Sequence, residues 1–389
     1  MKIFYFAGTK LPSQHAQSVH AMKMAQAFAK SGHDVTLFAK STHTRASEDI
    51  FKIYNTDPCF TLHMSSQSGT PALSSLKRLV GFSRQISKMD KPDLIFGHDP
   101  VALTLLNTGN VPILFEAHKV PTLSAHHWAF KQLLRHKNLR GIITISDALK
   151  KEYLKKYPEI EPEQIFVAYD GADLIENITA KEKDQKALRG RLNAFNVGYA
   201  GSMLPGKGVE LISRIAALRP EYDFHILGGT AKQVQKLETH NKHPNIYFYG
   251  FKEHAQVPSY LKAFDICIAP YQHRALIRTG RNVSRWMSPM KIFEYMAVEK
   301  PIIASRMPII EEILEHNHNA VLLPAAKEEI WAETIDELKE NEEKRKRLAH
   351  NAYDCLKDRY TWDKRAQAIT SFTFDPRAAI KTAQYSQTL

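Results

Sequence analysis

The sequence predicts an α/β protein with two doubly wound domains, each a parallel sheet that helices cover on both faces. Short apolar runs alternate with helical stretches over residues 1–173, and a second set with the same alternation starts at residue 196. Such alternation is typical of parallel sheets, because a parallel crossover needs a helix between successive strands. The length of 389 residues also exceeds one ordinary domain of about 150–200 residues.

The strands of the first domain are predicted from short apolar runs that end at glycine or polar residues. They are "KIFYFAG" (2–8), "DVTLFA" (34–39), "DLIFGH" (93–98), "PILFEAH" (112–118), "GIITIS" (141–146) and "IFVAYDG" (165–171). The stretches "SVHAMKMAQAFAKSGH" (18–33) and "ISDALKKEYLKKY" (145–157) have helical apolar spacing. This pattern makes residues 1–173 the N-terminal domain.

The second domain is predicted over residues 196–360. Its strands are "NVGYAGS" (196–202), "DFHILGG" (223–229), "NIYFYGF" (245–251), "DICIAPY" (265–271), "PIIAS" (301–305) and "AVLLP" (320–324). Residues 174–195 are polar and charged without a strand-like run, so we interpret them as the linker. Ligands of doubly wound sheets bind beyond the carboxyl ends of the strands, and we therefore expect a cleft between the domains to hold the site.

Composition limits the function classes. The net charge of +12 favours anionic partners, namely nucleotide sugars, nucleic acid or a membrane surface. No signal peptide is expected from the first residues, and no membrane span is expected because no window approaches about 20 apolar residues. The three cysteines and the histidine-rich spots at 126–127, 240–243 and 316–318 lack the spacing or carboxylate partners of a metal site. A cytoplasmic protein without a metal is therefore expected.

The segment 201–208 is the first candidate site. A strand runs into Gly201, and Gly206, Lys207 and Gly208 follow just before a helix. Glycines permit close approach of the backbone to a ligand, and a helix N-terminus carries partial positive charge that suits phosphate. An ordinary strand–loop–helix corner with a solvated lysine explains the same spacing.

The stretch "SPMKIFEYMA" (288–297) is the second candidate site. Ser288 is expected to cap a helix that starts at Pro289, so that the amides of Met290 and Lys291 face a ligand. Glu294, one turn further, would then accept hydrogen bonds from ribose hydroxyls. The alternative is that Glu294 lies on a solvated helix face.

The third candidate site follows a strand that we expect to end at Phe115. Glu116 and His118 would lie at its carboxyl end, where they can contact a sugar. A purely structural histidine is the alternative.

Taken together, these residues resemble glycosyltransferase family 4. The similarity lies in "YAGSMLPGKGVELI" (199–212), in residues 245–271 and 288–314, and in "GIITISDALKKEYL", "VAYDGAD" and "RYTWDKRA". The resemblance implies the GT-B fold, with two Rossmann-like domains that face each other across a cleft. It also implies a retaining, metal-independent transfer of a sugar, as in a hexosyltransferase, from a nucleotide-diphosphate sugar. The helix at residues 361–389 is expected to cross back to the first domain.

The resemblance also implies roles for individual residues. His118, Lys207 and Glu294 are the candidate catalytic residues, which contact the donor sugar, the leaving diphosphate and the ribose. The candidate donor-binding residues are Gly8, Gly201, Ser202, Gly250, Phe251, Ser288, Pro289, Met290, Lys291, Arg281 and Arg285.

The sequence departs from the family pattern at two donor contacts. Trp286 stands where a first glutamate is frequent, and Gly201-Ser202 replaces the usual Gly-Arg. A frequent N-terminal Gly-Gly is also missing from "AGTKLPSQHAQS". We hypothesise that an arginine of the loop "QHRALIRTGRNVSRWM" replaces the lost charge, and the candidates are Arg274, Arg278, Arg281 and Arg285. A basic loop that contacts solvent or the acceptor is the alternative.

The expected partners are a UDP- or GDP-linked sugar and a saccharide or lipid-linked acceptor of bacterial polysaccharide or glycolipid synthesis. Basic and apolar residues mix in "SSLKRLVGFSRQISK" and "KQLLRHKNLR", as in a peripheral anionic-membrane contact at the inner face of the membrane. Solvated helix faces are the alternative. Two other classes remain open at this point. One is a different GT-B enzyme, such as a sugar-nucleotide epimerase or a phosphorylase, and the other is a basic nucleic-acid-binding protein. No nucleic-acid-binding motif is present, so nucleic acid is not the expected partner.

Overall fold

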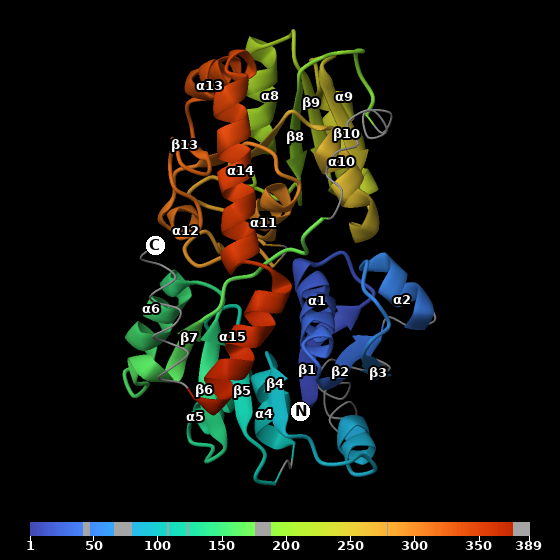
Figure 1. The fold of residues 1–389 in the computed structure, drawn as a ribbon, viewed down its shortest axis with the longest axis vertical. Helices are drawn as coiled ribbons and strands as arrows, with labels where there is room; N and C mark the ends of the chain where they lie inside the picture. The colour runs from blue at the N-terminus through green and yellow to red at the C-terminus, as the bar shows by residue number, and fades with distance from the viewer. Residues whose placement is uncertain are drawn as a thin grey trace. The chain divides into compact units, whose positions relative to one another are not determined.

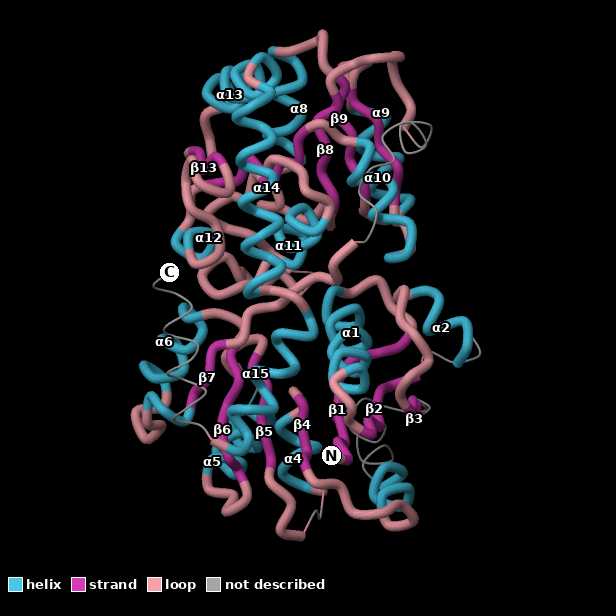
Figure 2. The backbone as a smooth tube through the Cα atoms, in the orientation of Figure 1, coloured by secondary structure: helices cyan, strands magenta, loops and turns pink. Residues whose placement is uncertain are grey.

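The computed structural model describes residues 1–41, 47–65, 80–106, 109–122, 124–175, 188–277 and 279–375. It divides into two compact units, which are described separately. Unit 1 comprises residues 1–169 together with the C-terminal segment that begins at Trp362. Unit 2 comprises Asp170–Thr361. Figure 1 shows the elements of each unit, and Figure 2 marks the strands of the two sheets.

Unit 1 is built on a seven-stranded parallel sheet with the order β3-β2-β1-β4-β5-β6-β7. The strands are β1 (Lys2–Leu11), β2 (Asp34–Ser41), β3 (Thr61–Ser65), β4 (Leu94–Gly97), β5 (Ile113–Ala117), β6 (Leu139–Thr144) and β7 (Ile165–Val167). The helices are α1 (Ala16–Lys30), α2 (Ser47–Ile53), α4 (Pro100–Leu105), α5 (Ser124–Leu134), α6 (Asp147–Lys156), the 3-10 turn η1 (Pro162–Gln164) and α15 (Trp362–Phe374). The strand order reverses between β1 and β4, which is where doubly wound sheets bind ligands.

Unit 2 repeats this plan with a six-stranded parallel sheet of order β10-β9-β8-β11-β12-β13. Its strands are β8 (Asn196–Ala200), β9 (Asp223–Leu227), β10 (Ile246–Gly250), β11 (Ile266–Ala269), β12 (Ile302–Ser305) and β13 (Val321–Leu323). Its helices are α8 (Val209–Leu218), α9 (Ala231–His240), η2 (His254–Gln256), α10 (Val257–Ala263), α11 (Met290–Ala297), α12 (Pro308–Glu311), α13 (Glu328–Glu340) and α14 (Glu342–Arg359). Here the order reverses between β8 and β11.

Two differences from the predicted strands have physical reasons. β3 was not predicted, because this edge strand has one neighbour and its half-buried residues alternate between polar and apolar types. β5 does not end at Phe115 but continues to Ala117, so Glu116 lies inside the strand and is fully buried. Glu116 interrupts the apolar run of this strand, and the strand was therefore expected to end before it, at Phe115.

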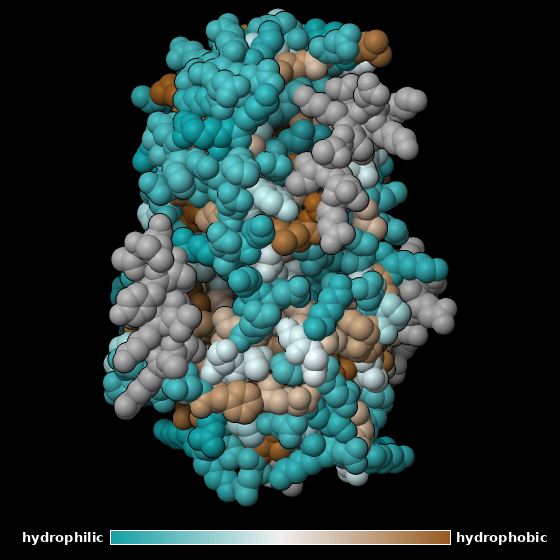
Figure 3. Space-filling model, in the orientation of Figure 1, coloured by the Kyte–Doolittle hydropathy of each residue, from teal (hydrophilic) through white to brown (hydrophobic). Residues whose placement is uncertain are grey.

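The last helix, α15, packs within unit 1, beside α1 (Figure 1). The rings of Phe372 and Phe166 stack with centroids 5.1 Å apart, and the Trp362 ring meets the His20 ring edge-on at 5.3 Å. The preceding helix, α14, belongs to unit 2, where it buries Leu348, Ala352 and Leu356. Its opposite side is hydrophilic (Figure 3). The chain therefore passes from unit 2 to unit 1 at residues 361–362.

The predicted linker, 174–195, lies partly outside the described residues. Its described end is attached to unit 2, where Arg191 forms an ion pair with the buried carboxylate of Asp223 at 2.7 Å. Arg189 donates to the carbonyl of Phe248 on β10. Among the described helices, none combines the length and apolar composition needed to cross a bilayer.

Candidate functional site

Unit 2 places two lysines around one aromatic ring at the carboxyl ends of β8 and β11. The Nζ atoms of Lys207 and Lys291 lie 5.1 and 5.0 Å from the centroid of the Tyr271 ring. Lys207 precedes α8, whereas Lys291 lies in the first turn of α11. The two ammonium groups therefore face the same place, just beyond the switch point of the sheet.

Lys291 is the less solvated of the two. Its side chain is buried, and Nζ has no hydrogen-bond partner among the described residues. Nζ lies 3.6 Å from the centroid of Tyr199, whose hydroxyl is held by the Ser202 carbonyl at 2.8 Å. A buried ammonium group without an acceptor is costly, and such groups mark sites that bind an anion. Burial and the neighbouring Lys207 lower the pKa of Lys291 well below its ordinary value of 10.5.

The loop between β8 and α8 adds less to this site than expected. A Cβ at Gly206 or Gly208 would lie 1.8 or 2.1 Å from the carbonyl oxygens of Arg274 and Pro270, so both glycines serve close packing of backbone on backbone. Gly201 does adjoin Lys291, since a Cβ at Gly201 would lie 2.7 Å from Nζ of Lys291. Burial lowers the pKa of Lys207 to about 8. The loop therefore contributes the positive charge of Lys207, and Gly201, which has no side chain, leaves the ammonium group of Lys291 open to a ligand.

The start of α11 differs from the prediction. Ser288 is not the cap, since Pro289 holds the N-cap position and no side chain caps the helix. The Ser288 hydroxyl instead accepts the Asp170 amide at 3.1 Å, and the Ser288 carbonyl accepts the Met290 amide at 3.1 Å. The expectations of a serine cap and of a free Met290 amide are thus wrong. The reason is that Ser288 closes a tight turn and holds the first residues of unit 2.

Glu294 is placed one turn after Lys291 and remains partly exposed, with 22% of its side chain accessible. Its Oε1 lies 3.6 Å from Nδ1 of His254, which precedes α10. The charge of Glu294 acts in the direction that raises the pKa of Lys291, although burial outweighs it. The carboxylate of Glu294 and the buried ammonium group of Lys291 thus lie within one turn of α11.

Gly250 and Phe251 lie at the carboxyl end of β10. The Gly250 carbonyl accepts the Gly228 amide at 2.8 Å, which joins this end to that of β9. Phe251 is exposed, with 43% of its surface accessible. An exposed aromatic ring beside these strand ends is a surface on which a nucleobase can stack.

None of the loop arginines that the structure describes is buried. Arg274 and Arg285 are exposed, Arg281 is half-buried, and Arg278 lies outside the described residues. The loop is a short hairpin in which Leu276 bridges Asn282. Among the described cations near Gly201, the buried one is Lys291.

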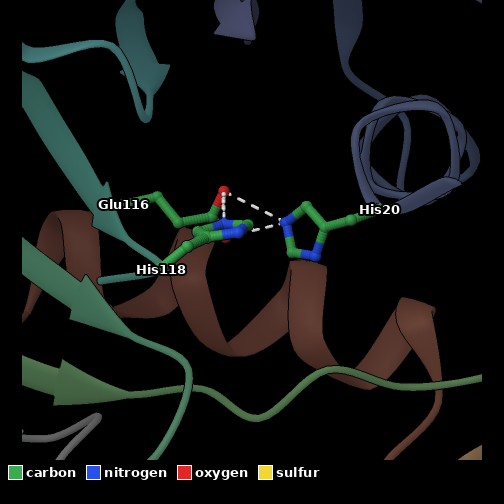
Figure 4. A group of neighbouring side chains, drawn as sticks. All are labelled: His20, Glu116 and His118. Atoms are coloured by element: carbon green, nitrogen blue, oxygen red, sulfur yellow. Dashed lines mark hydrogen bonds and ion pairs between the residues drawn. The ribbon is translucent and has the colours of Figure 1, made fainter. Parts of the chain in front are cut away.

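In unit 1, four side chains converge on the buried carboxylate of Glu116. Arg365 of α15 lies 2.7 Å from Oε1, and Nε2 of His20 lies 3.0 Å from Oε1 and 3.1 Å from Oε2. Nε2 of His118 and the hydroxyl of Tyr5 lie 3.2 and 3.5 Å from Oε2. Figure 4 shows the Glu116 carboxylate joined by dashed lines to both His118 and His20, which comes from α1 on the opposite side. Burial favours the neutral acid, but His20, Arg365 and His118 outweigh it and hold the pKa of Glu116 well below its ordinary value.

A third histidine completes this cluster. Nδ1 of His98, which follows β4, lies 3.9 Å from Oε2 of Glu116. Nε2 of His98 accepts the Gly8 amide at 3.0 Å, so this Gly8 amide is already engaged within unit 1. Burial and the nearby His118 lower the pKa of His98 well below its ordinary value.

His20, Glu116 and His118 have the residue types and spacing of a metal site, since their ligand atoms lie within 4.8 Å of one another. The donor set does not fit a divalent ion well. The guanidinium of Arg365 already occupies the carboxylate at 2.7 Å, and a second positive charge beside it in a buried place is unfavourable. The cluster is better described as a carboxylate whose acceptor positions are taken by hydrogen bonds from Arg365, His20 and Tyr5.

Sequence reasoning found Glu116 and His118 but missed His20, His98 and Arg365. The members come from α1, the end of β4, β5 and α15, and no local pattern links positions so far apart in the chain. "RYTWDKRA" marked the Arg365 region as a motif without indicating what it contacts.

Comparison with known proteins identifies the family. The profile of the group described as glycosyl transferases group 1 matches residues 180–354, and that of glycosyltransferase family 4 matches residues 17–176. The chain belongs to glycosyltransferase family 4. The predicted family and the GT-B fold class are thereby confirmed.

Individual relatives of this family 4 chain are distant. TuaH of Bacillus subtilis, assigned to teichuronic acid biosynthesis, is 24% identical over 227 residues, or 56% of this chain. That match spans 54%, about half, of TuaH. An uncharacterized glycosyltransferase of Methanocaldococcus jannaschii is 26% identical over 263 residues, 61% of this chain and 71% of that protein. The crystal structure of Anabaena HepE with UDP and glucose has a TM-score of 0.72 at 18% identity, and the match covers 96% of this chain and 100% of that chain. The last likeness shows the fold alone.

Proposed function

We propose that this chain is a retaining glycosyltransferase that moves a hexose from a nucleotide-diphosphate sugar to a saccharide or lipid-linked acceptor. The observation that carries the proposal is the buried ammonium group of Lys291, which lies beside Lys207 and one turn from the carboxylate of Glu294. It has no hydrogen-bond partner in the part of the chain that the structure describes. Two cations and a nearby acceptor match the diphosphate and the ribose of a nucleotide. HepE was crystallised with UDP and glucose, which favours UDP as the nucleotide to test first.

The chemistry follows from where charge develops. Cleavage of the bond between sugar and diphosphate leaves negative charge on the β-phosphate. Preorganised cations in a site of low dielectric stabilise that charge, and they need not reorganise during the reaction. Lys207 and Lys291 are placed for this role, and Lys291 supplies the charge that the missing family arginine would carry. If the acceptor attacks from the same face, the departing phosphate oxygen takes the proton from the acceptor hydroxyl. No protein nucleophile is then required.

His118 is the residue of unit 1 that we assign to the transferred sugar. Its side chain is 10% accessible, and its Nε2 lies 3.2 Å from the buried carboxylate of Glu116. The accessible part of the imidazole can therefore contact a sugar hydroxyl.

The test is a thermal-shift screen of the wild type against UDP-, GDP-, ADP- and CMP-sugars. One class is expected to stabilise the protein, and Lys207→Ala should abolish that shift. Lys236→Ala, an exposed lysine on α9, is the matched control and should keep it. Turnover with an acceptor mixture, read by NMR of the anomeric proton, then tests retention. An inverted product, or a converted sugar nucleotide without any acceptor, would contradict the assigned reaction.

For the acceptor side, we propose peripheral contact of unit 1 with an anionic membrane. Leu105 of α4 and Trp128 of α5 are each 54% exposed, and the two helices adjoin where Thr104 donates to the Ala129 carbonyl at 3.0 Å. Lys131 and Arg135 are exposed on or beside α5. Apolar anchors among basic residues favour binding at a lipid surface. Lys77 and Arg78, also considered from the sequence, lie outside the described residues.

Vesicle flotation tests this membrane contact. Vesicles that contain phosphatidylglycerol should retain the wild type at low salt, and Trp128→Ala should weaken retention more than Leu218→Ala, an exposed apolar residue of unit 2. Equal retention of both variants, or none at any salt concentration, would contradict the proposed surface.

A further inference from the structure

In unit 1, a loop at residues 12–15 connects the carboxyl end of β1 to α1. β4 ends at Gly97, which pairs with Phe6, whereas β1 continues to Leu11 beside Ser41 of β2. Doubly wound sheets bind ligands beyond the carboxyl ends of their strands, next to the point where the strand order reverses. The 12–15 loop therefore lies where a ligand of unit 1 is expected.

The hydroxyl of Tyr54 holds this loop at both main-chain groups of one residue. It accepts the Ser13 amide at 2.7 Å and donates to the Ser13 carbonyl at 2.9 Å. A phenol has one proton to donate and can accept as well, so a single hydroxyl serves both groups. Burial raises the pKa of Tyr54, and the hydroxyl therefore keeps its proton at neutral pH. Both hydrogen bonds can then exist at the same time.

A chain of hydroxyl groups ties the side chain of the same loop residue to α1. The buried Ser18 hydroxyl donates to the Lys10 carbonyl at 3.0 Å, which uses its only proton. The hydroxyls of Ser13 at 2.6 Å and Thr9 at 3.0 Å must then donate to Ser18. Oγ of Ser13 remains an acceptor for the His15 amide at 3.3 Å. These hydrogen bonds form one consistent network around the loop.

The anchor of the loop is itself fixed. The Tyr54 side chain, just after α2, is buried. The residues that follow it are bound to α1, where Nζ of the buried Lys23 donates to the Asn55 carbonyl. Oε1 of Gln26, also buried in α1, accepts the Asp57 amide at 2.6 Å. The position of the Tyr54 hydroxyl is therefore set by α1 and α2, and not by the loop that it holds.

We propose that Tyr54 is a positioning residue that holds the 12–15 loop in one conformation for a saccharide acceptor. The loop offers the side chains of Gln14 and His15, which are both exposed. Amide and imidazole groups can donate and accept hydrogen bonds, as the hydroxyls of a saccharide require. The acceptor is assigned here because the cations and the carboxylate of unit 2 are assigned to the nucleotide. This ligand class rests on the proposed function, whereas the order of the loop does not.

Removal of the Tyr54 hydroxyl should loosen the loop while the buried ring still fills its space. Tyr54→Phe loses both hydrogen bonds to Ser13, and local opening of the loop should become about 3- to 10-fold more frequent. The acceptor must then order the loop as it binds, which weakens its binding. Binding of the nucleotide should not change, because none of the residues assigned to it contacts this network.

The first test is hydrogen–deuterium exchange of the full-length protein without any ligand, read by mass spectrometry of a peptide that spans residues 10–16. Exchange of this peptide should be about 3- to 10-fold faster in Tyr54→Phe, and faster also in Ser18→Ala. Tyr222→Phe is the matched control, since it removes a hydroxyl of a buried tyrosine that donates to Asp336 at 2.8 Å in unit 2. It should leave the peptide unchanged. Unchanged exchange in Tyr54→Phe would overturn the proposal.

The second test measures acceptor and nucleotide separately, with UDP-glucose as donor and a panel of octyl glycosides as acceptor probes. Tyr54→Phe should raise the KM for the glycoside about 10-fold with little change in kcat, and it should keep the Kd for UDP. Gln14→Ala should raise the same KM, but less in the Tyr54→Phe background, where the loop no longer presents this side chain. Gln235→Ala, an exposed glutamine on α9, is the control and should change neither constant.

The two tests separate the possible failures. Faster exchange with an unchanged KM for the glycoside would overturn the role of the loop in acceptor binding. A loss of UDP affinity as large as the rise in KM would show that Tyr54 supports the whole unit and not one contact. If the wild type transfers glucose to none of the glycosides, the result counts against the proposed function, while the exchange result on the loop stands by itself.

Discussion

The ammonium group of Lys291 lies over the ring of Tyr199, 3.6 Å from its centroid, and has no hydrogen-bond acceptor among the described residues. The ring face offers partial compensation through its quadrupole, which is weaker than an anion would supply. The buried ammonium group of Lys291 therefore destabilises the ligand-free protein, and a bound diphosphate would compensate its charge. Residues kept for binding often reduce stability in this way.

Lys291→Met is therefore expected to stabilise the ligand-free protein while it removes activity. Because the folded-state pKa of Lys291 is lowered, the unfolded chain binds more protons, and the penalty is largest below the ordinary value of 10.5. We expect a gain in the free energy of unfolding of about 1–2 kcal/mol at neutral pH, measured by urea titration. The gain should shrink as the pH rises toward 10.5.

The functional cost of Lys291→Met should be a fall in kcat of about 100- to 1,000-fold, the usual effect of losing one stabiliser of transition-state charge. Lys236→Met is the exposed control and should change neither stability nor kcat. A variant of Lys291 that is less stable than the wild type and equally active would refute this account.

Lys207 predicts how affinity for UDP depends on pH. Burial lowers its pKa to about 8, so the free protein loses this positive charge as the pH rises through that value. Binding a diphosphate then requires uptake of a proton. The Kd for UDP, measured by calorimetry, should stay constant below that pKa and weaken steadily above it. In Lys207→Arg the charge persists, and the decline should largely vanish. A Kd of the wild type that is flat across this range would show that Lys207 does not face the diphosphate.

The loop arginines provide a contrast between exposed and buried cations. Arg274 and Arg285 are exposed, whereas the Lys291 side chain is buried beside Gly201. Alanine at either arginine should change the donor KM by no more than about twofold, as for most surface substitutions. Lys291→Ala should raise it by at least tenfold, equivalent to about 1.4 kcal/mol. Steady-state kinetics of the three variants decides between them, and a large effect at Arg285 alone would restore the arginine hypothesis.

Much of the fold was predictable, because buried parallel strands read as continuous apolar runs whose order in the chain is visible. The same signal failed where polarity interrupted it. The half-polar edge strand β3 was missed, and Glu116 made β5 look two residues too short. A local sequence pattern therefore predicts a strand well when all residues of that strand are equally buried.

The candidate sites were predictable in position but not in detail. Motif spacing located Lys207, Lys291 and Glu294 near one another, yet it assigned Lys291 through its backbone rather than its buried side chain. The partnership of Glu116 with Arg365 depends on two positions 249 residues apart in the chain. Such contacts are set by the packing of α15 in unit 1, which the residues around either position do not encode.

The assignment of Glu294 to the ribose is testable with altered nucleotides. If its carboxylate accepts both ribose hydroxyls, 2′,3′-dideoxy UDP should bind the wild type about 10- to 100-fold more weakly than UDP, as expected for hydrogen bonds to a charged group. In Glu294→Ala the two nucleotides should bind alike, because the carboxylate that distinguishes them is gone. Calorimetric Kd values for the four combinations form a double-mutant cycle, and their coupling energy isolates this contact from general effects of the substitution. Glu238→Gln, an exposed carboxylate on α9, is the control and should preserve the full discrimination. If the alanine variant still discriminates between the nucleotides as strongly as the wild type, the ribose lies elsewhere and the ion pair with His254 is the main role of Glu294.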